Sequence, residues 1–323
     1  MKKDQKKGNM KGFSKKLLAI LVAALMGVML FAGCASSTTN TETTENETAA
    51  GTENTESTET AEVTETAETA ETTESTESAS TDSSLDDVKA KGTLVLGMDD
   101  SFPPMGFRDE NNELTGFDLD LATEVASRLG VTVEPVAIDW SQKENELNTC
   151  NIDVIWNGFT ITEERKEATE MTFAYMKNRQ VVVVMNDSEY QTLSDLAGKT
   201  LSLQAQSSAD DALTDSPDFK ASLGEVVYLN NNADALRDLE IGGCDAVLMD
   251  EVVANYYITN GSSYRVLDES LADEEYGIGC RKGSVALRDA IEETLSEMAG
   301  DGTLAEISTK WFGKDVTTVS AAN

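Results

Sequence analysis

The chain has 323 residues and is strongly acidic, with 25 lysine and arginine residues against 59 aspartate and glutamate residues and a net charge of −34. This charge excludes nucleic acid as a partner, because a phosphate backbone requires a basic face. Histidine is absent throughout, which excludes Ser-His-Asp and Cys-His catalysis and removes the commonest zinc ligand. The sequence therefore predicts no metal site and no cofactor.

The first 33 residues predict a signal peptide. Lysines are concentrated in residues 2–16, and an apolar run follows at 17–32. A basic stretch followed by an apolar stretch is the order found in secretory signals. As a helix, the run would span about 24 Å. This is shorter than the roughly 30 Å hydrocarbon core of a bilayer, so a permanent transmembrane anchor is the less favoured alternative.

The apolar run leads through Ala32 and Gly33 into Cys34, and small residues before a cysteine resemble a bacterial lipobox. By that resemblance Cys34 is acylated, becomes the mature N-terminus and attaches the protein to a membrane. The alternative is an ordinary cleaved signal peptide followed by a free cysteine. Residues 34–84 predict a disordered acidic tether, because this Thr/Glu-rich stretch holds too little apolar area to offset chain entropy.

From residue 85 onward, short β-rich runs alternate with amphipathic stretches. The predicted strands are 93–98, 132–137, 154–156, 180–185, 200–203, 226–229, 246–249 and 276–281. The predicted helices are 119–129, 144–148, 208–213, 233–241 and 284–298. For the helix at 119–129 we expect Asp118 as the N-cap and Gly130 as the C-terminal stop. This alternation predicts an α/β fold with right-handed crossovers.

A weak internal repeat indicates two similar halves. Residues 146–155 and 238–248 each combine a helix end, a turn and an aspartate that opens an apolar strand. Two α/β halves would enclose a cleft, and ligands of open α/β sheets bind beyond the carboxyl ends of the strands. Chance similarity between two common turns is the alternative.

The segment 156–165 predicts a site for a carboxylate. A strand ends there, a turn with Gly158 follows, and a helix begins near residue 162. Helix N-termini favour acidic side chains, so Arg165 in the first turn is out of place for a purely structural residue. It would add positive charge to an anion-binding helix start. Further donors would come from two residues of the strand end, Asn157 and Thr160. The alternative is an exposed ion pair between Arg165 and one of the two preceding glutamates.

Two other strand ends carry polar side chains. Asp250 follows the apolar run 246–249 and is placed to meet an ammonium group. Gln204, Ser207 and Ser208 follow the run 200–203 and form a second set of donors. In both cases the alternative is capping of the helix that follows.

Aromatic side chains lie past the first two predicted strands. Asp99 ends the first strand, and Pro103 and Pro104 would stiffen the loop that fixes Phe102 in place. Trp140 lies beyond the second strand. Two aromatic rings at strand ends can enclose a flat or aliphatic side chain. Packing between lobes is the alternative for Trp140.

Residues 88–313 resemble the bacterial extracellular solute-binding protein family 3, the polar amino-acid receptors of ABC importers. The resemblance rests on three motifs in order: LTGFDLDLA at 114–122, NIDVIWNGFTITEER at 151–165 and GTLAEISTKWF at 302–312. It implies an α/β fold of the type II periplasmic-binding-protein kind, with two lobes joined by two hinge strands. Lobe 1 would comprise residues 85–180 and 279–316, lobe 2 residues 181–278, and a tail residues 317–323.

The resemblance also implies roles for the polar site residues. Arg165 matches the family's carboxylate-binding arginine, and Thr160 matches its hydroxyl partner. Asp250 matches the ammonium-binding aspartate. Ser207 and Ser208 match carboxylate contacts supplied by the second lobe.

The remaining site residues would recognise the ligand's side chain. Phe102 matches an aromatic clamp, Trp140 another pocket wall and Asp99 a position that can meet a ligand side chain, whereas Asn157 replaces a serine of some members. Acidic groups such as Asp99 would favour a basic ligand. The amides of Asn157 and Gln204 would favour a neutral polar one such as glutamine or cystine, and we slightly prefer the neutral class.

The predicted function is capture of a free polar amino acid, without catalysis, by a monomeric lipoprotein that delivers it to an ABC importer permease. The predicted location is the extracellular face of the cytoplasmic membrane, as in Gram-positive bacteria, with the lipid on Cys34 as the anchor. One alternative is an enzyme, because a periplasmic cyclohexadienyl dehydratase has the same fold. The other is a sensor that signals through a membrane partner.

Overall fold

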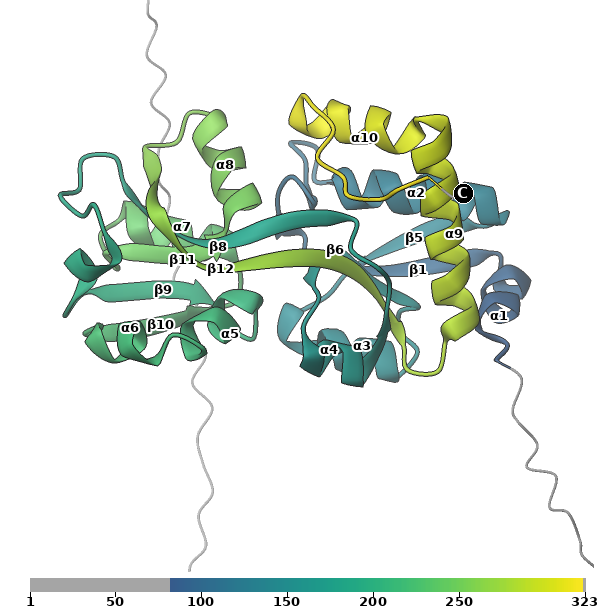
Figure 1. The fold of residues 1–323 in the computed structure, drawn as a ribbon, viewed down its shortest axis with the longest axis horizontal. Helices are drawn as coiled ribbons and strands as arrows, with labels where there is room; N and C mark the ends of the chain where they lie inside the picture. Colours follow the sequence, from purple (N-terminus) through teal and green to yellow (C-terminus); the bar gives the residue numbers. More distant parts are fainter. Residues whose placement is uncertain (1–81, 322–323) are drawn as a thin grey trace, which may run out of the picture. The chain divides into compact units, whose positions relative to one another are not determined.

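The computed structural model describes residues 82–321, so the predicted signal peptide, Cys34 and nearly all of the predicted tether lie outside the described residues. Within this range, one nine-stranded sheet runs through the whole fold in the order β10-β9-β11-β8-β12-β6-β1-β5, with β7 paired to β12 (Figure 1). A separate three-stranded sheet, β2-β3-β4, is formed by residues 101–115. None of the described helices is both long and apolar enough to cross a membrane.

The first lobe is built on three strands of the sheet, with helices on both faces (Figure 1). Its strands are β1 (Thr93–Met98), β5 (Thr132–Ala137) and β6 (Val154–Thr160), with the short β2 (Ser101–Phe102), β3 (Gly106–Arg108), β4 (Leu114–Thr115) and β7 (Thr169–Met171). Its helices are α1 (Ser84–Lys91), α2 (Phe117–Leu129), η1 (Trp140–Gln142), α3 (Lys143–Asn148), α4 (Glu163–Ala168), α9 (Val285–Asp301) and α10 (Thr303–Phe312). Strands β1, β5 and β6 are parallel, as the βα alternation predicts.

The second lobe repeats the same layering. Its strands are β9 (Thr200–Gln204), β10 (Glu225–Leu229) and β11 (Ala246–Asp250), which are parallel to one another. Its helices are η2 (Leu193–Leu196), α5 (Ser208–Thr214), α6 (Pro217–Ser222), α7 (Asn232–Glu240) and α8 (Glu251–Thr259). The strand predictions were correct to within one residue here. Strands β9 and β11 are buried along almost their whole length, whereas β10 at the edge of the sheet is partly exposed.

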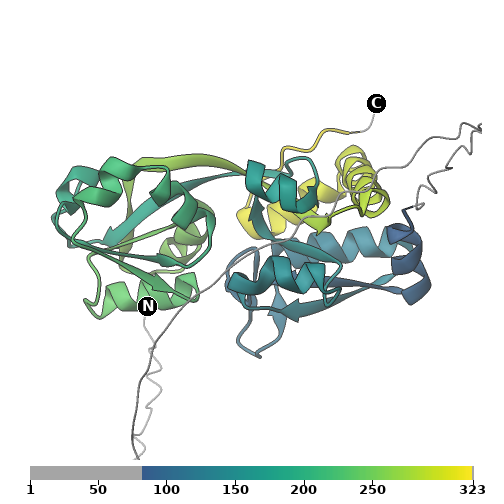
Figure 2. The same cartoon turned by 90° about the horizontal axis from the view of Figure 1, so that it is seen from below.

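Two long antiparallel strands, β8 (Met176–Met185) and β12 (Tyr264–Arg281), connect the lobes (Figure 2). We call them the crossing strands. The sequence predicted only the apolar end of each, at 180–185 and 276–281. The other parts were missed because they carry charged residues, such as the acidic run 273–275. A strand with one solvated face does not read as an apolar run.

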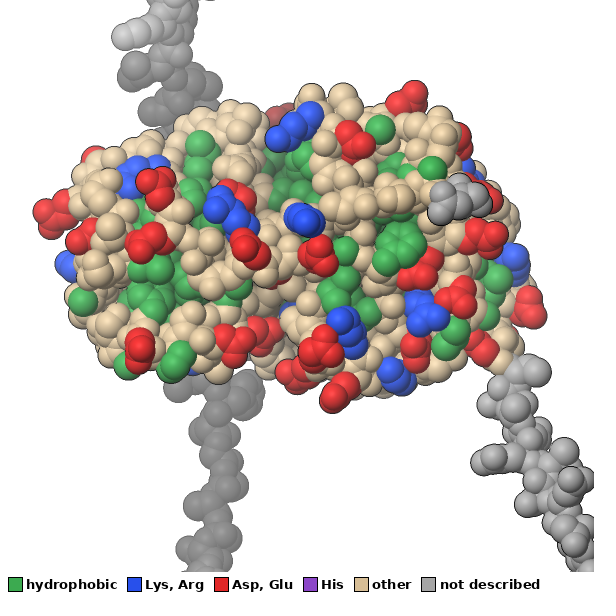
Figure 3. Space-filling view, in the orientation of Figure 1, with side chains coloured by type: hydrophobic (Ala, Val, Ile, Leu, Met, Phe, Trp, Pro, Cys, Tyr) green, Lys and Arg blue, Asp and Glu red, His purple; other side chains and the backbone are tan. Residues whose placement is uncertain are grey.

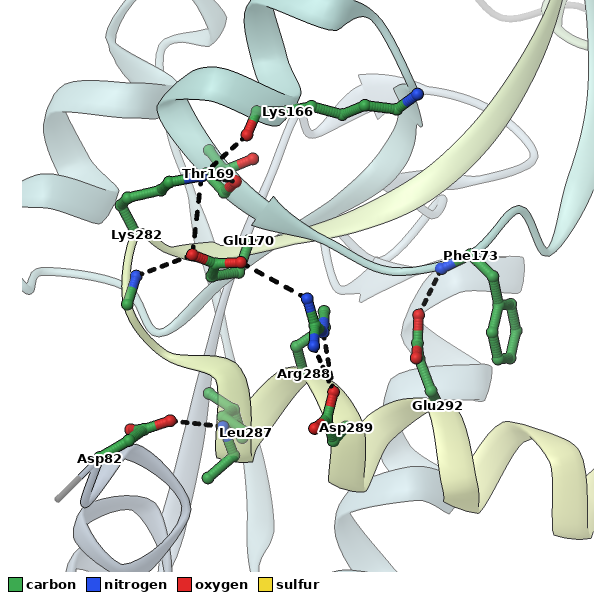
Figure 4. A network of polar contacts seen from close by, with 12 residues as sticks. Asp82, Lys166, Thr169, Glu170, Phe173, Lys282, Leu287, Arg288, Asp289 and Glu292 are labelled. Atoms are coloured by element: carbon green, nitrogen blue, oxygen red, sulfur yellow. Dashed lines mark hydrogen bonds and ion pairs between the residues drawn. The ribbon is translucent and has the colours of Figure 1, made fainter.

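The C-terminal helices α9 and α10 return to complete the first lobe, and a polar network connects α9 to β7 and its neighbours (Figure 4). Glu170 of β7 accepts hydrogen bonds from the backbone N–H of Gly283 and from Arg288 of α9, and it pairs with Lys282 at 3.6 Å. Glu292 of α9 accepts a hydrogen bond from the backbone N–H of Phe173. The first lobe is thus assembled from two distant parts of the chain.

The cap predictions for α2 were half correct. Gly130 is the C-terminal stop, in the left-handed conformation with φ of 80°. Asp118 is not the N-cap, because the helix begins at Phe117 after Gly116. Its fully buried carboxylate instead accepts hydrogen bonds from the backbone N–H of Gly158 (2.7 Å) and the hydroxyl of Tyr175 (2.8 Å). Hydrogen-bond donors from distant parts of the chain therefore bind this carboxylate, and it does not cap the helix.

The buried carboxyl group of Asp118 should make the free energy of unfolding depend on pH. Burial raises the pKa of Asp118 from 3.8 to about 7, against the hydrogen bonds from Tyr175 and Gly158. The folded state then binds more protons than the unfolded state between those values, so this group's contribution to the free energy of unfolding falls as pH rises from about 4 to about 7, by up to about 4 kcal/mol. Asp118→Asn should lack this slope in urea unfolding curves. Parallel stability profiles of the two proteins would contradict the assignment.

Candidate functional site

A small enclosed cavity lies where the strand ends of the two lobes meet. It is lined by ten of the eleven residues that the sequence singled out as ligand-binding: Asp99, Phe102, Trp140, Asn157, Gly158, Arg165, Gln204, Ser207, Ser208 and Asp250. The eleventh, Thr160, is also buried but turns its hydroxyl to Glu274, to which it donates at 3.0 Å. The structure thus brings together residues that are more than 150 positions apart in the sequence.

Arg165 is buried in this cavity, with only 6% of its surface exposed. The hydroxyl of Thr162 caps α4 by accepting from the backbone N–H of Arg165, which directs the side chain inward. Its Nη1 donates to the carbonyl of Thr160 (2.9 Å), and its guanidinium group lies 4.6 Å from the centre of the Phe159 ring. The alternative of a surface ion pair is wrong, because Arg165 is buried and Glu163 pairs with Lys166 instead.

The positive charge of Arg165 is only partly balanced by neighbouring groups. Its nearest carboxylate is that of Asp211, at 3.9 Å, on the exposed side of α5. Burial lowers the pKa of Arg165, opposed by the negative charges of Asp211 and Glu144. A guanidinium group stays protonated in proteins, so the cavity contains a buried cation. Within residues 82–321 the guanidinium group of Arg165 makes one hydrogen bond, to the carbonyl of Thr160.

Asp250 brings the opposite charge from the second lobe. It ends β11, is 3% exposed, and makes no side-chain cap to α8, so the capping alternative is wrong for this residue. It accepts hydrogen bonds from Nδ2 of Asn178 (2.8 Å) and the hydroxyl of Tyr276 (2.5 Å), both on the crossing strands. Burial and the negative charge of Glu274 raise the pKa of Asp250 well above its usual range.

The remaining polar residues join the lobes across the cavity. Asp99 accepts from Nε2 of Gln204 at 2.8 Å, and its other oxygen accepts from the backbone and hydroxyl of Ser101. Ser207 caps α5 by accepting from the backbone N–H of Ala209, so capping is part of its role. A further contact between the lobes is made by Lys143, buried with Nζ 3.1 Å from the carbonyl of Gln206.

Asn157 differs from Asp99 and Gln204, whose side chains are hydrogen-bonded. It is 1% exposed, and among the described residues neither atom of its side-chain amide has a hydrogen-bond partner. Buried polar groups are almost always paired, so an orphaned amide in a cavity indicates a missing partner. Next to it, Gly158 has φ of 62°, and a Cβ there would lie 2.9 Å from the Phe102 ring. Glycine is therefore required at the cavity wall.

Four polar residues behind the cavity were missed by sequence reasoning: Asn178, Gln180, Glu274 and Tyr276, all on the crossing strands. The available signal was the alternation of Asn178 and Gln180 at the start of a strand that is otherwise valine-rich. Polar residues at every second position of a buried strand face one side and require partners there. Among residues 82–321, no group of three or more metal-ligating acidic or cysteine side chains is arranged to hold an ion.

Comparison with known proteins agrees with this geometry. Residues 94–314 match the family model of bacterial extracellular solute-binding proteins, family 3. The chain belongs to this family. The L-cystine-binding protein TcyJ of Escherichia coli K12 is 30% identical over 236 residues, which cover 72% of this chain and 87% of TcyJ. The L-cystine-binding protein TcyA of Bacillus subtilis is 31% identical over 233 residues, covering 71% of this chain and 84% of TcyA.

A solved structure extends the likeness to the family's fold. An ABC uptake transporter substrate-binding protein from Streptococcus pneumoniae with bound histidine superposes with a TM-score of 0.71 at 38% identity, covering 74% of this chain and 99% of that one. The predicted α/β fold of the type II periplasmic-binding-protein kind is therefore confirmed. These relatives are named for binding rather than catalysis, so this family member is an extracellular solute-binding protein and not an enzyme.

Proposed function

We propose that this protein captures a free α-amino acid between its lobes and presents it to the permease of an ABC importer. The observation that carries the proposal is the pair of buried opposite charges on one cavity, Arg165 from the first lobe and Asp250 from the second. Their chemistry matches the α-carboxylate and α-ammonium groups of an amino acid. The named relatives bind cystine or hold histidine, which supports this class of ligand.

The cavity walls favour a polar ligand side chain. The unpaired amide of Asn157 can both donate and accept, whereas both carboxylate oxygens of Asp99 already accept hydrogen bonds from Ser101 and Gln204. A cationic side chain could use only the acceptor capacity that is left on the oxygen already bound by Gln204, because the other oxygen accepts twice from Ser101. We therefore favour a neutral polar amino acid over a basic one, with Phe102 and Trp140 enclosing its aliphatic part.

Each lobe alone would supply about half of the ligand contacts. We propose that the lobes, divided as the sequence predicts at residues 180/181 and 278/279, close by bending of the crossing strands. Closure would bring Lys143 to the carbonyl of Gln206 and Gln204 to Asp99. Ligand would then shift an equilibrium between open and closed forms, because it completes its contacts only in the closed one.

The experiment is thermal-shift screening of the purified protein against the twenty amino acids, cystine and ornithine. A ligand that binds only the folded state stabilises it by about 2.7 kcal/mol at a hundred times its Kd, so a true ligand should raise Tm by several degrees. Neutral polar amino acids should give the largest rise. A folded protein whose Tm responds to none of these compounds would contradict the proposal.

We also propose that acyl chains on Cys34 anchor the protein to the extracellular face of the cytoplasmic membrane. The proposal rests on the sequence around Cys34 and on the tether composition of residues 34–84. Cys34→Ser should move the protein from the membrane fraction to the medium and abolish labelling by a palmitate analogue. Cys150→Ser, at an exposed cysteine of the folded part, is the matched control and should stay in the membrane fraction. Equal labelling of Cys34→Ser and wild type would refute the anchor.

A further inference from the structure

Glu274 occupies a central position behind the proposed ligand cavity without lining it. It lies on the crossing strand β12 and is half-buried. Its Oε1 accepts hydrogen bonds from Nδ2 of Asn178 (2.5 Å) and Nε2 of Gln180 (2.8 Å), and its Oε2 accepts from the hydroxyl of Thr160 (3.0 Å). A single carboxylate therefore accepts hydrogen bonds from Thr160 of β6, in the first lobe, and from two residues of the crossing strand β8.

Each of these three donors also touches a residue of the cavity. The same Nδ2 of Asn178 donates to Asp250, and the same Nε2 of Gln180 donates to the hydroxyl of Ser208 at 3.1 Å. The carbonyl of Thr160 accepts from the guanidinium group of Arg165, at 2.9 Å. Glu274 is thus connected, through one intervening residue in each case, to Arg165, to Asp250 and to Ser208.

We propose that Glu274 is a positioning residue for ligand binding: its carboxylate orients Thr160, Asn178 and Gln180 so that the contacts of both lobes are set together. The inference rests on the proposed function, because it assigns a role within that same site. A carboxylate suits this task since it is acceptor-only and can take several donors at once. A glutamine could still accept from Asn178 and Gln180 through its oxygen, but its NH₂ would have to donate to the Thr160 hydroxyl, so the substitution reverses that hydrogen bond and removes the negative charge.

The charge of Glu274 has a second consequence at Asp250. Asn178 bridges the two carboxylates, and burial together with this negative neighbour raises the pKa of Asp250. The charged or titratable groups near Asp250 are Glu274 and Tyr276 of β12 and, more distantly, Arg165 of α4. Strand β8 adds neutral amides there, and its Arg179 is paired with Glu251.

A ligand ammonium group would favour the ionised form of Asp250 and so lower the pKa of this residue on binding. Binding of an amino acid should therefore release protons, and affinity should fall as pH falls. With the charge of Glu274 removed, Asp250 should ionise more readily in the empty protein. The number of protons released on binding should then become smaller.

The test is calorimetric titration of the full protein, as wild type, Glu274→Gln and Glu275→Gln, with the amino acid that stabilises the wild type most. Titrations in two buffers of different ionisation enthalpy, at pH 5.5, 6.5 and 7.5, count the protons released. Glu275→Gln is the matched control, because Glu275 is the next residue on the same strand and its side chain is exposed. Ligand-free Tm values show whether each variant folds.

We expect Glu274→Gln to bind about tenfold or more weakly with fewer protons released, while Glu275→Gln matches wild type. Wild-type affinity and proton release in Glu274→Gln would overturn the inference but leave the proposed function intact. Weaker binding with an unchanged proton count and pH profile would overturn it too, since a merely structural role predicts that result. If Glu274→Gln does not fold, Glu274→Asp replaces it, with partial loss of affinity and retained proton release expected. Failure of wild type to bind any amino acid would instead defeat the proposed function.

Discussion

Replacing Arg165 with alanine is expected to weaken amino-acid binding by about 100-fold or more. Hydrogen bonds between charged groups in a desolvated site are among the strongest in proteins, and removing one partner leaves the ligand carboxylate buried without compensation. The fold should survive, because the backbone N–H of Arg165, and not its side chain, makes the cap to Thr162. Calorimetric titration measures the affinity, and the Tm of the ligand-free protein reports folding.

The matched control for this prediction is Arg237→Ala. Arg237 is an exposed arginine on α7 of the second lobe, so its removal changes net charge by the same amount without touching the cavity. Its affinity should equal that of wild type. An Arg165→Ala protein that folds and binds with wild-type affinity would eliminate Arg165 as the carboxylate receptor.

The second large effect is expected for Asp250→Asn, with binding weaker by about 100-fold. The substitution keeps the shape of the side chain and an oxygen that can accept from Asn178 and Tyr276, but it removes the charge that would meet an ammonium group. Since the carboxylate is buried near Glu274, the ligand-free variant should be at least as stable as wild type. Loss of affinity and unimpaired stability should thus appear together.

Asp268→Asn provides the control for Asp250→Asn. Asp268 lies on β12 with its side chain exposed, and the substitution has the same charge change at a site away from the cavity. It should leave affinity and Tm unchanged. Undiminished binding by Asp250→Asn would show that the ammonium group lies elsewhere, and a strongly lowered Tm would show that the charge of Asp250 serves folding.

The electrostatic setting of the molecule also affects such measurements. On the face shown in Figure 3, acidic side chains are spread over both lobes with fewer basic ones between them, in line with the net charge of −34. Exposed charges are screened by salt at a distance of about 8–10 Å, whereas buried groups such as Arg165 and Asp250 are screened much less. The affinity losses of Arg165→Ala and Asp250→Asn should therefore persist at physiological ionic strength. The surface substitutions Arg237→Ala and Asp268→Asn should leave the affinity unchanged there.

Much of the site could be predicted because its charged and polar side chains follow directly after strands. Arg165 violated the charge preference of a helix start, and Asp250 followed an apolar strand directly. Both signals are local, so they are visible in a single sequence. Assembly of the residues into one cavity followed from the α/β topology, in which parallel strands end on the same side.

What the sequence did not reveal depends on contacts between distant segments. Asp118 looked like a helix cap because aspartate is favoured there, but Gly158 and Tyr175 bind its carboxylate in the core. Glu274 lies in the acidic run 273–275 and gave no prediction from the sequence, yet the pairing of β12 with β6 and β8 brings it to Thr160 and Gln180. Local propensity cannot anticipate a partner that tertiary structure supplies.

One calorimetric series decides whether the cavity binds both ends of a free α-amino acid. The wild-type protein is titrated with its best amino acid and with the two analogues that lack either the α-carboxylate or the α-ammonium group. We expect saturable one-to-one binding of the amino acid and affinity losses of about 100-fold or more for each analogue, matching Arg165→Ala and Asp250→Asn respectively. Binding of either analogue as tightly as the amino acid itself would show that the cavity does not recognise both ends of the ligand.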